Sequence, residues 1–451
     1  MTRPPVEVAD ILRVQGDCFR EQNRSWLGYQ QLNVLRAISA CRTAALGGHL
    51  DSCSRCHLQA ISYNSCRNRH CPKCQAQARL RWLARREQDL LPVHYFHVVF
   101  TLPHALNPLC QRHPRLLYDL LFRACAQTML EVAADARHLG ARIGFLSILH
   151  TWGQNLRLHP HLHCVIPAGG FDQGYSHWVH PKYAFFLPVK VLSRVFRGKY
   201  LALLQQALRQ RRIDCPSTLV RALLKEDWVV YAKPAFGDPV RVLRYLGRYT
   251  HRVAISNQRL LSFDGRSVSF RWKDYSHGNK QRIMTLTASE FLRRFCQHVL
   301  PRGFVRIRHF GYLANARRAA LIALARQQLA CQPPPASHPT NSPKATWRCP
   351  RCGANMLIGP NHTAQQLAFR CDIPDTSLIP TLYTDQRRCG TTSKPTCVAS
   401  AKLPPYSPFL LACNSRDYSQ VRINLPCCPI QPGSSSLFAP PNTGQFAYLA
   451  P

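Results

Sequence analysis

Acidic side chains are scarce in this sequence. Asp and Glu contribute 22 of the 451 residues and Lys and Arg contribute 59, so the formal net charge is +37 and the isoelectric point is near 10.1. Such an excess attracts phosphates regardless of base sequence and with strong salt dependence. Basic and aromatic residues also interleave in residues 266–275, as in grooves where bases stack above a tracked backbone. The composition therefore predicts a nucleic-acid partner, without distinguishing DNA from RNA.

Two further absences narrow the class of protein. The sequence has no apolar run of 18 residues, and residues 1–25 carry charges and no signal-like apolar segment. Neither a membrane span nor export is predicted, and a cytoplasmic location is expected. The sequence also lacks the Gly-x-x-x-x-Gly-Lys-Ser/Thr pattern that binds ATP phosphates. Any ATP-driven unwinding of a nucleic acid must therefore come from another protein.

Cysteine, by contrast, is abundant, at 21 residues. In the cytoplasm, cysteines are expected to be metal ligands or free thiols rather than disulfides. Cys53-Ser-Arg-Cys56 and Cys71-Pro-Lys-Cys74 are separated by fourteen residues, a spacing typical of a tetrahedral zinc ribbon. We therefore predict that Cys53, Cys56, Cys71 and Cys74 bind one structural Zn²⁺.

Other residues leave the zinc ligand set open. Cys66 and His70 lie beside the second pair and could shift the set or bind a second ion. Far downstream, Cys349-Pro-Arg-Cys352 forms another knuckle. Cys371 and Cys389 are available as its partners, although neither belongs to a further Cys-x-x-Cys.

The run His159-Pro-His161-Leu-His163, followed by the apolar residues 164–166, is the most informative stretch. Alternate side chains of a strand point to one face, so the three imidazoles would project together. Histidine is a common metal ligand. The run therefore predicts a metal site, in preference to a solvated edge strand with chance histidines.

About eighty residues later, a helix is predicted to begin at Asp238 and Pro239, a good N-cap followed by a residue suited to the first helical position. Tyr245 and Tyr249 are four residues apart and so share one helix face. A lone pair of this kind is more often a pair of core aromatics. Here the pair is surrounded by basic residues, as a phosphate-handling site requires, namely Arg241, Arg244, Arg248 and Arg252.

Together these motifs resemble the HUH endonuclease superfamily, in which His-hydrophobe-His supplies two metal ligands and a helical tyrosine is the nucleophile. His161-Leu162-His163 matches the first element, and the order of histidines before tyrosines is that of replication initiators and rolling-circle transposases. The paired tyrosines and the cysteine-rich segment 65–74 resemble the two-tyrosine transposases of rolling-circle insertion sequences and their N-terminal zinc-binding domain. The resemblance covers roughly residues 40–320.

This resemblance implies an α+β fold with an antiparallel-sheet nuclease core, flanked by helices and preceded by a small zinc ribbon. The catalytic metal would be Mg²⁺ or Mn²⁺, held by His161, His163 and a third polar residue near the histidine strand. The third ligand is open among several residues, with Gln154 as the first choice before His150, Asn155 and His159.

The implied activity is that of a DNA transposase that nicks and rejoins single-stranded DNA at the ends and target of an insertion sequence. Tyr245 or Tyr249 would attack a phosphate, giving a 5′-phosphotyrosine and a free 3′-hydroxyl, while the other tyrosine permits a second strand transfer. Host helicase and replication proteins would be further partners at the bacterial nucleoid. Two other classes remain open: a zinc-ribbon nucleic-acid-binding protein without catalysis, and a hydrolase that uses the histidines to activate water.

The length exceeds that of one comfortable core, so more than one domain is expected. The predicted segments are an N-terminal helical segment (1–45), a zinc-binding ribbon and basic helix (46–91), the catalytic domain (92–330), a Pro-rich linker (331–346), a possible second zinc knuckle (347–390) and a mostly disordered tail (391–451).

Overall fold

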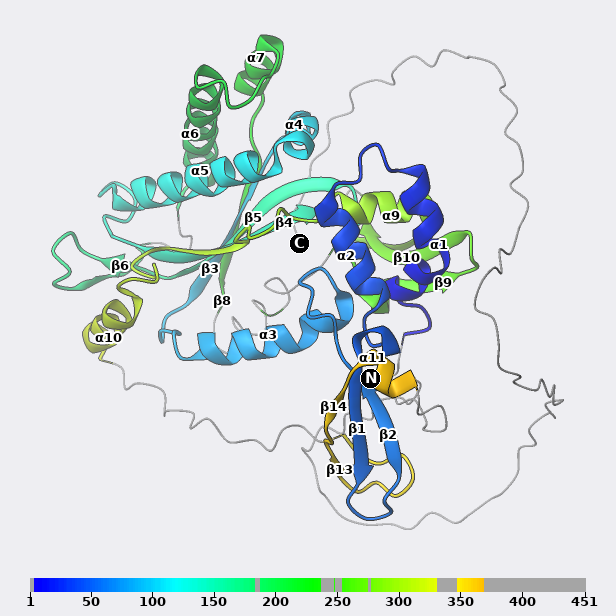
Figure 1. Cartoon of the computed structure of the whole chain (residues 1–451). Coiled ribbons are helices and arrows are strands. Elements are labelled where there is room, and N and C mark those ends of the chain that lie inside the picture. Colours follow the sequence, from blue (N-terminus) through cyan, green and yellow to red (C-terminus); the bar gives the residue numbers. More distant parts are fainter. Residues whose placement is uncertain are drawn as a thin grey trace, which may run out of the picture. The chain divides into compact units, whose positions relative to one another are not determined.

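The structure is a computed structural model of the chain, and it describes residues 4–182, 187–236, 247, 254–274, 277–330 and 347–368 (Figure 1). These residues form helices and antiparallel sheets, which confirms the predicted α+β class. The predicted linker and tail lie outside the described residues, as do Cys371 and Cys389.

A five-stranded antiparallel sheet carries the histidine run, with the strand order β12-β4-β5-β3-β8. Two neighbouring strands, β4 and β5, form an antiparallel pair on either side of the turn that carries residue 154, with His150 opposite His161. The strands of this sheet are β3 (Tyr95–Thr101), β4 (Gly144–Trp152), β5 (Leu158–Pro167), β8 (Val230–Phe236) and β12 (Ile307–Gly311).

Different helices bury the two faces of this sheet, because side chains alternate along each strand. Helices α5 and α6 share a large core with Phe100 and Leu162 of one face. On the other face, Leu83 of α3 packs against a cluster that contains Ile148 and Val165. The three helices are α3 (Pro72–Glu87), α5 (Pro114–Ala134) and α6 (Val189–Arg209). His161 and His163 alternate with Leu162, so they lie on the α3 face.

A second, three-stranded sheet has the order β11-β10-β9 and packs with α9 and the two N-terminal helices. Thr287 is the N-cap of α9, and its hydroxyl accepts a hydrogen bond from the Glu290 N–H at 3.2 Å. Phe19, Phe270 and Phe291 are fully buried in the shared core. The elements are α1 (Val8–Gln22), α2 (Tyr29–Ser39), β9 (Leu260–Phe263), β10 (Ser267–Asp274), β11 (Lys280–Thr287) and α9 (Ala288–Cys296).

A small zinc-ribbon-like sheet combines two segments that are far apart in the sequence. The N-terminal hairpin of β1 (Gly48–Cys53) and β2 (Gln59–Tyr63) pairs through β1 with β13 (Met356–Leu357) and β14 (Asn361–His362). The predicted second knuckle therefore belongs to the same sheet as the N-terminal ribbon.

The remaining elements complete the described part of the chain, and β6, β7 and α10 share a small core of their own. They are α4 (Asn107–Arg112), α7 (Ser217–Lys225), α10 (Arg318–Gln328), α11 (Ala364–Ala368), β6 (Gly170–Phe171), β7 (Trp178–Val179) and the 3₁₀ turns at Ala44–Leu46, His104–Leu106 and Asn257–Arg259.

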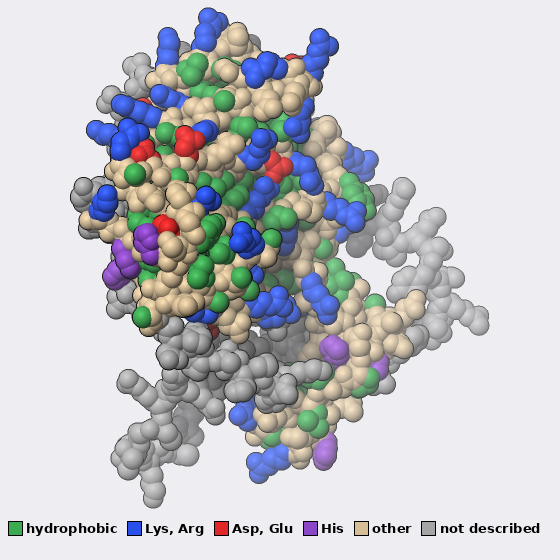
Figure 2. All heavy atoms as spheres, turned by 90° about the vertical axis from the view of Figure 1, so that its left-hand side faces the viewer, with side chains coloured by type: hydrophobic (Ala, Val, Ile, Leu, Met, Phe, Trp, Pro, Cys, Tyr) green, Lys and Arg blue, Asp and Glu red, His purple; other side chains and the backbone are tan. Residues whose placement is uncertain are grey.

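The surface is strongly basic. Figure 2 shows Lys and Arg side chains scattered over one face with few acidic ones between them. Within the described part of the chain, no helix has the length and apolarity needed to cross a bilayer.

Candidate functional site

Three imidazoles from the hairpin of β4 and β5 form a compact group. One ring nitrogen from each of His150, His161 and His163 lies within 4.8 Å of the other two, and we call these residues the histidine cluster. The Nε2 atoms of His161 and His163 are 3.1 Å apart. Two ligands about 2.1 Å from one octahedral ion lie roughly 3.0 Å apart when their bonds are perpendicular. The donor atoms are therefore spaced to share one divalent ion.

The second nitrogen of each of these two rings is already engaged. His161 Nδ1 lies 2.7 Å from the carbonyl oxygen of His159, which can only accept, so Nδ1 carries the proton and Nε2 keeps its lone pair. His163 Nδ1 lies 2.9 Å from Nε2 of His97, a residue with no exposed surface. Partners of this kind orient ligating imidazoles and select their tautomer. His97 could not be identified from the sequence, because a lone histidine in an apolar strand carries no spacing signal.

The third member of the cluster is His150, which had been an alternative to Gln154. Its ring stacks on Trp152 at a centroid distance of 4.6 Å and lies 4.5 Å from the ring of His163. Gln154 follows β4 in the turn and lines the same cavity, so it remains a predicted ligand. His159 is not a member of this group: it contacts His104 at 3.2 Å, its ring centroid lies 5.0 Å from that of His161, and burial lowers the pKa of His159 to about 3.

The turn that carries Gln154 is fixed by side chains from the second sheet and its helix. Arg259 donates to the backbone carbonyl of Gln154, and Arg294 Nη1 donates to that of Asn155 at 3.0 Å. His298 Nε2 lies 3.0 Å from the carbonyl oxygen of Leu156, which adopts a left-handed conformation with a φ of 61°. These contacts set the distance between the turn and the histidine cluster.

A cavity of about 870 Å³ opens over the histidine cluster. Its lining also includes residues of β10 and α9, namely Trp272, Lys273 and Arg293. The first two belong to the basic-aromatic stretch that the sequence analysis assigned to a nucleic-acid groove. A wall of aromatic and cationic side chains can stack on bases and hold phosphates beside the metal ligands.

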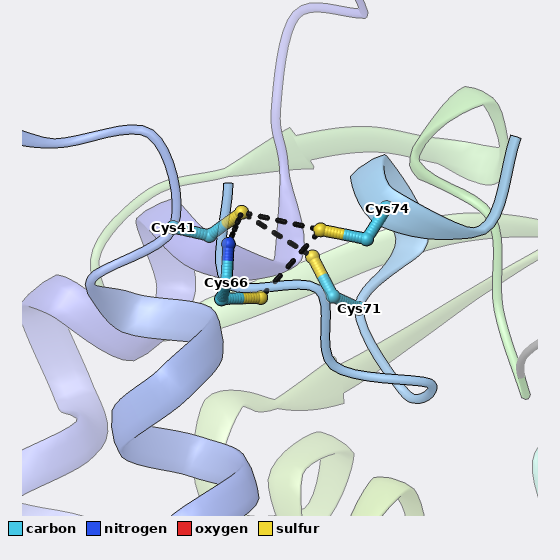
Figure 3. A group of neighbouring side chains, drawn as sticks. All are labelled: Cys41, Cys66, Cys71 and Cys74. Carbon is cyan, nitrogen blue, oxygen red and sulfur yellow. Dashed lines mark hydrogen bonds between the residues drawn. The ribbon is translucent and has the colours of Figure 1, made fainter. Parts of the chain in front are cut away.

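A group of four cysteines lies at the start of α3 (Figure 3). The Sγ atoms of Cys41, Cys66, Cys71 and Cys74, here called the first quartet, lie 3.6–3.7 Å apart in the three pairs in contact. Four thiolates at about 2.3 Å from a tetrahedral Zn²⁺ lie roughly 3.8 Å apart. Hydrogen bonds from the Cys66 and Cys71 thiols lower the pKa of Cys41 to about 7. The quartet thus has the spacing of a zinc site.

This grouping corrects the prediction that Cys53, Cys56, Cys71 and Cys74 share one ion. Cys53 and Cys56 lie at the turn of the β1–β2 hairpin and meet Cys349 and Cys352 in a second quartet. Cys41 and Cys66 flank the other end of the hairpin, which at about 3.3 Å per residue is roughly 20 Å long. The hairpin therefore separates the two knuckles that the sequence analysis had joined. His70 is buried, and burial lowers its pKa to about 3.

The first quartet lies at the start of α3, and Arg69 beside it is hydrogen-bonded to the segment that follows α9. Cys71 is the N-cap of α3, and Arg69 donates through Nη2 to the carbonyl of Pro301 at 2.9 Å.

Gly247 approaches α3 further along that helix: a Cβ placed on Gly247 would lie 2.9 Å from Leu83 Cδ1. Gly247 is a described residue and is helical and buried. The predicted Tyr245, Tyr249, Arg241, Arg244, Arg248 and Arg252 lie outside the described residues.

Comparisons with known proteins find matches to both the histidine-bearing region and the N-terminal cysteine-rich region. Residues 144–320 match a family described as "Putative transposase", and residues 11–102 match a "Transposase zinc-binding domain". The chain is similar to "Putative transposase y4qJ" of Sinorhizobium fredii (strain NBRC 101917 / NGR234), with 47% identity over 382 residues, which are 79% of this chain and 96% of that protein. It is also similar to "Transposase for insertion sequence element IS801" of Pseudomonas savastanoi pv. phaseolicola, with 30% identity over 344 residues, 72% and 83% of the two chains. No solved structure matches the chain.

Proposed function

The chain belongs to the family of IS91/IS801-type transposases, and on this premise we propose that it nicks and rejoins single-stranded DNA through a 5′-phosphotyrosine intermediate. A tyrosine of the pair Tyr245 and Tyr249 attacks a DNA phosphate, and the bond from phosphorus to the 3′ oxygen breaks. A 3′-hydroxyl of another strand later attacks the phosphotyrosine, which forms a new phosphodiester and releases the tyrosine. The sequence has no ATP-binding P-loop pattern, so host helicase and replication proteins supply the single strand.

The observation that carries this proposal is the paired geometry of His161 and His163. Their Nε2 atoms are 3.1 Å apart on one face of the sheet, and their Nδ1 atoms face the His159 carbonyl and His97. His161, His163 and a third residue, either His150 or Gln154, would hold Mg²⁺ or Mn²⁺. Such an ion polarises the phosphodiester and stabilises charge on its oxygens. The structural cofactor is Zn²⁺, for which the matched zinc-binding domain and the cysteine quartets provide support.

The position of Gly247 supports the choice of nucleophile. Gly247 lies two residues from each tyrosine in the sequence and approaches Leu83 of α3. Leu83 in turn packs against the cluster of Ile148 and Val165, on the face of the sheet that carries the histidines. Gly247 therefore lies against α3, on the face of the sheet that carries the histidines.

The cavity supports DNA as the substrate. Trp272 and Lys273 line the same cavity of about 870 Å³ as the histidine cluster, which is enough space for nucleotides to enter beside the metal ligands. The predicted arginines 241, 244, 248 and 252 would add phosphate contacts from the tyrosine segment. The formal charge of +37 makes sequence-independent phosphate contacts the main source of affinity.

The decisive experiment traps the protein on a labelled single-stranded oligonucleotide that contains an insertion-sequence end, with Mg²⁺ or Mn²⁺ present. Wild type and Tyr29→Phe, a change at an exposed tyrosine of α2, should form a covalent adduct that survives denaturation. Tyr245→Phe/Tyr249→Phe should bind the oligonucleotide but form none. Cleavage by wild type without any adduct would instead indicate a hydrolase, and an adduct in the double variant would place the nucleophile elsewhere, with Tyr231 and Tyr275 tested next.

A further inference from the structure

The second quartet joins cysteines from the two ends of the described chain. Cys53 Sγ lies 3.4 Å from Cys352 Sγ, and Cys56 Sγ lies 3.6 Å from Cys349 Sγ. All four sulfur atoms lie within 4.8 Å of one another, close to the roughly 3.8 Å separation expected around a tetrahedral Zn²⁺. Residues 349 and 352 lie outside the matched zinc-binding domain, which spans residues 11–102.

Each half of this group has the local shape of a zinc knuckle. In the N-terminal half, the backbone N–H groups of Arg55 and Cys56 both donate to Cys53 Sγ at 3.4 Å. In the C-terminal half, the Cys349 N–H donates to the Ala354 carbonyl at 2.8 Å, and Gly353 adopts a φ of 72° that a residue with a side chain rarely adopts. Tight turns of this kind aim two thiolates at one ion.

The contacts around the sulfur atoms show that the two halves form one folded unit. The buried carboxylate of Asp51 on β1 accepts a hydrogen bond from Trp347 Nε1 at 2.7 Å and another from Ser62 Oγ on β2 at 2.6 Å. Cys53 pairs with Met356 across β1 and β13. Gly359 passes so close to the Leu50 carbonyl that a side chain there would overlap it. The C-terminal segment is therefore fitted to the hairpin by packing as well as by sulfur.

We propose that Cys53, Cys56, Cys349 and Cys352 bind a second Zn²⁺, which clips residues 347–368 onto the N-terminal hairpin. The clip closes a loop of 293 residues between Cys56 and Cys349, and the catalytic region lies inside that loop. Ligand crosslinks that close long loops restrict the unfolded chain most. The ion is thus a long-range structural crosslink, distinct from the first quartet, whose members lie within 33 residues of one another in the sequence.

Zinc content in a set of cysteine variants tests which cysteines share an ion. We expect two zinc ions per purified wild-type chain and two in Cys18→Ser, a control at an exposed thiol outside both quartets. Cys53→Ser, Cys349→Ser and the combination of the two should each retain one ion. Cys53→Ser/Cys71→Ser should retain none, because it breaks both quartets. Two ions in Cys349→Ser, or one ion in Cys53→Ser/Cys71→Ser, would overturn the proposal.

A second measurement uses the wild-type chain and does not depend on the folding of variants. Two equivalents of Co²⁺ should bind with the thiolate charge-transfer absorption of tetrahedral sulfur sites, and only one equivalent would refute the second site. Hydrogen exchange provides the long-range readout. Cys53→Ser should expose the amides of residues 347–368 to exchange in chains that still hold the first ion, and unchanged protection there would show that zinc does not hold the segment. Neither readout involves DNA cleavage, so each is independent of the proposed activity.

Discussion

The histidine cluster and the cysteine quartets are all groups of metal ligands, but they are assembled in different ways. His150, His161 and His163 come from two strands joined by one turn, and His150 and His161 are direct cross-strand partners. The second quartet brings Cys53 against Cys352, 299 residues away. The histidine cluster therefore depends on local strand geometry, whereas the second quartet depends on the whole chain having folded. Changes in the cluster should remove chemistry and spare the fold, whereas changes in a quartet should act first on the fold.

The largest effect is expected from the histidines. His161→Ala or His163→Ala should lower DNA nicking by at least about a thousandfold, because each removes an Nε2 donor from the catalytic ion. Oligonucleotide affinity should stay within a few-fold, since many basic residues share the phosphate contacts. Nicking rates and binding titrations check this, with His138→Ala in the turn after α5 as the control. Loss of zinc or of the melting transition in the His161 or His163 variants would show that the histidine cluster also supports the fold.

Removal of a ligand from the first quartet should affect the fold. Cys71→Ser or Cys74→Ser should release one zinc ion and unfold the segment that contains α3, because metal binding supplies folding energy in small modules. Circular dichroism, zinc analysis and proteolysis of residues 40–90 check the outcome. Nicking should fall as well, since α3 begins at Cys71 and covers the histidine face. An unchanged melting profile in protein lacking this zinc would contradict the structural role.

His97 should give an intermediate effect that belongs to the catalytic ion. His97→Phe fills the buried site but removes the 2.9 Å contact with His163 Nδ1. Loss of such a partner typically weakens metal binding about 10–100-fold. The metal concentration for half-maximal nicking should rise by that factor, while the rate at saturating Mn²⁺ recovers. His97→Gln, which can still accept from His163, should restore part of the affinity. A lower rate at saturating metal with unchanged metal dependence would make His97 merely a packing residue.

The smallest effect should come from whichever of His150 and Gln154 does not bind the ion. We predict that Gln154→Ala lowers nicking modestly and that Mn²⁺ rescues it, because a neutral amide oxygen is a weak ligand. His150→Ala should then cost more, since its ring already lies within 4.8 Å of the other two ligand atoms. Nicking rates measured in parallel Mg²⁺ and Mn²⁺ titrations show which of the two variants loses more activity. Full activity in Gln154→Ala would assign the third position to His150.

The difference between local and long-range assembly also explains what could be predicted from the sequence. Strand alternation placed His161 and His163 on one face, and the family resemblance implied the α+β class. The position of His150 opposite His161 depends on the pairing of β4 with β5. Knuckle spacing identified Cys53 with Cys56 and Cys71 with Cys74, but spacing does not say which knuckles share an ion. Cys41, a single cysteine after α2, has no pattern at all. The contact between His97 and His163 depends on the register of β3 against β5, which tertiary packing decides.

The pairing of β1 with β13 has a consequence for the order in which the protein can be completed during synthesis. The hairpin of β1 and β2 is made early, but its third strand follows Cys349, which is 293 residues after Cys56. At roughly 5–20 residues per second, a ribosome needs about 15 to 60 s to cover that distance. Throughout this interval the nascent chain carries Cys53 and Cys56 as an incomplete pair beside an open strand edge. Thiol reactivity at these two positions therefore distinguishes unfinished chains from finished ones.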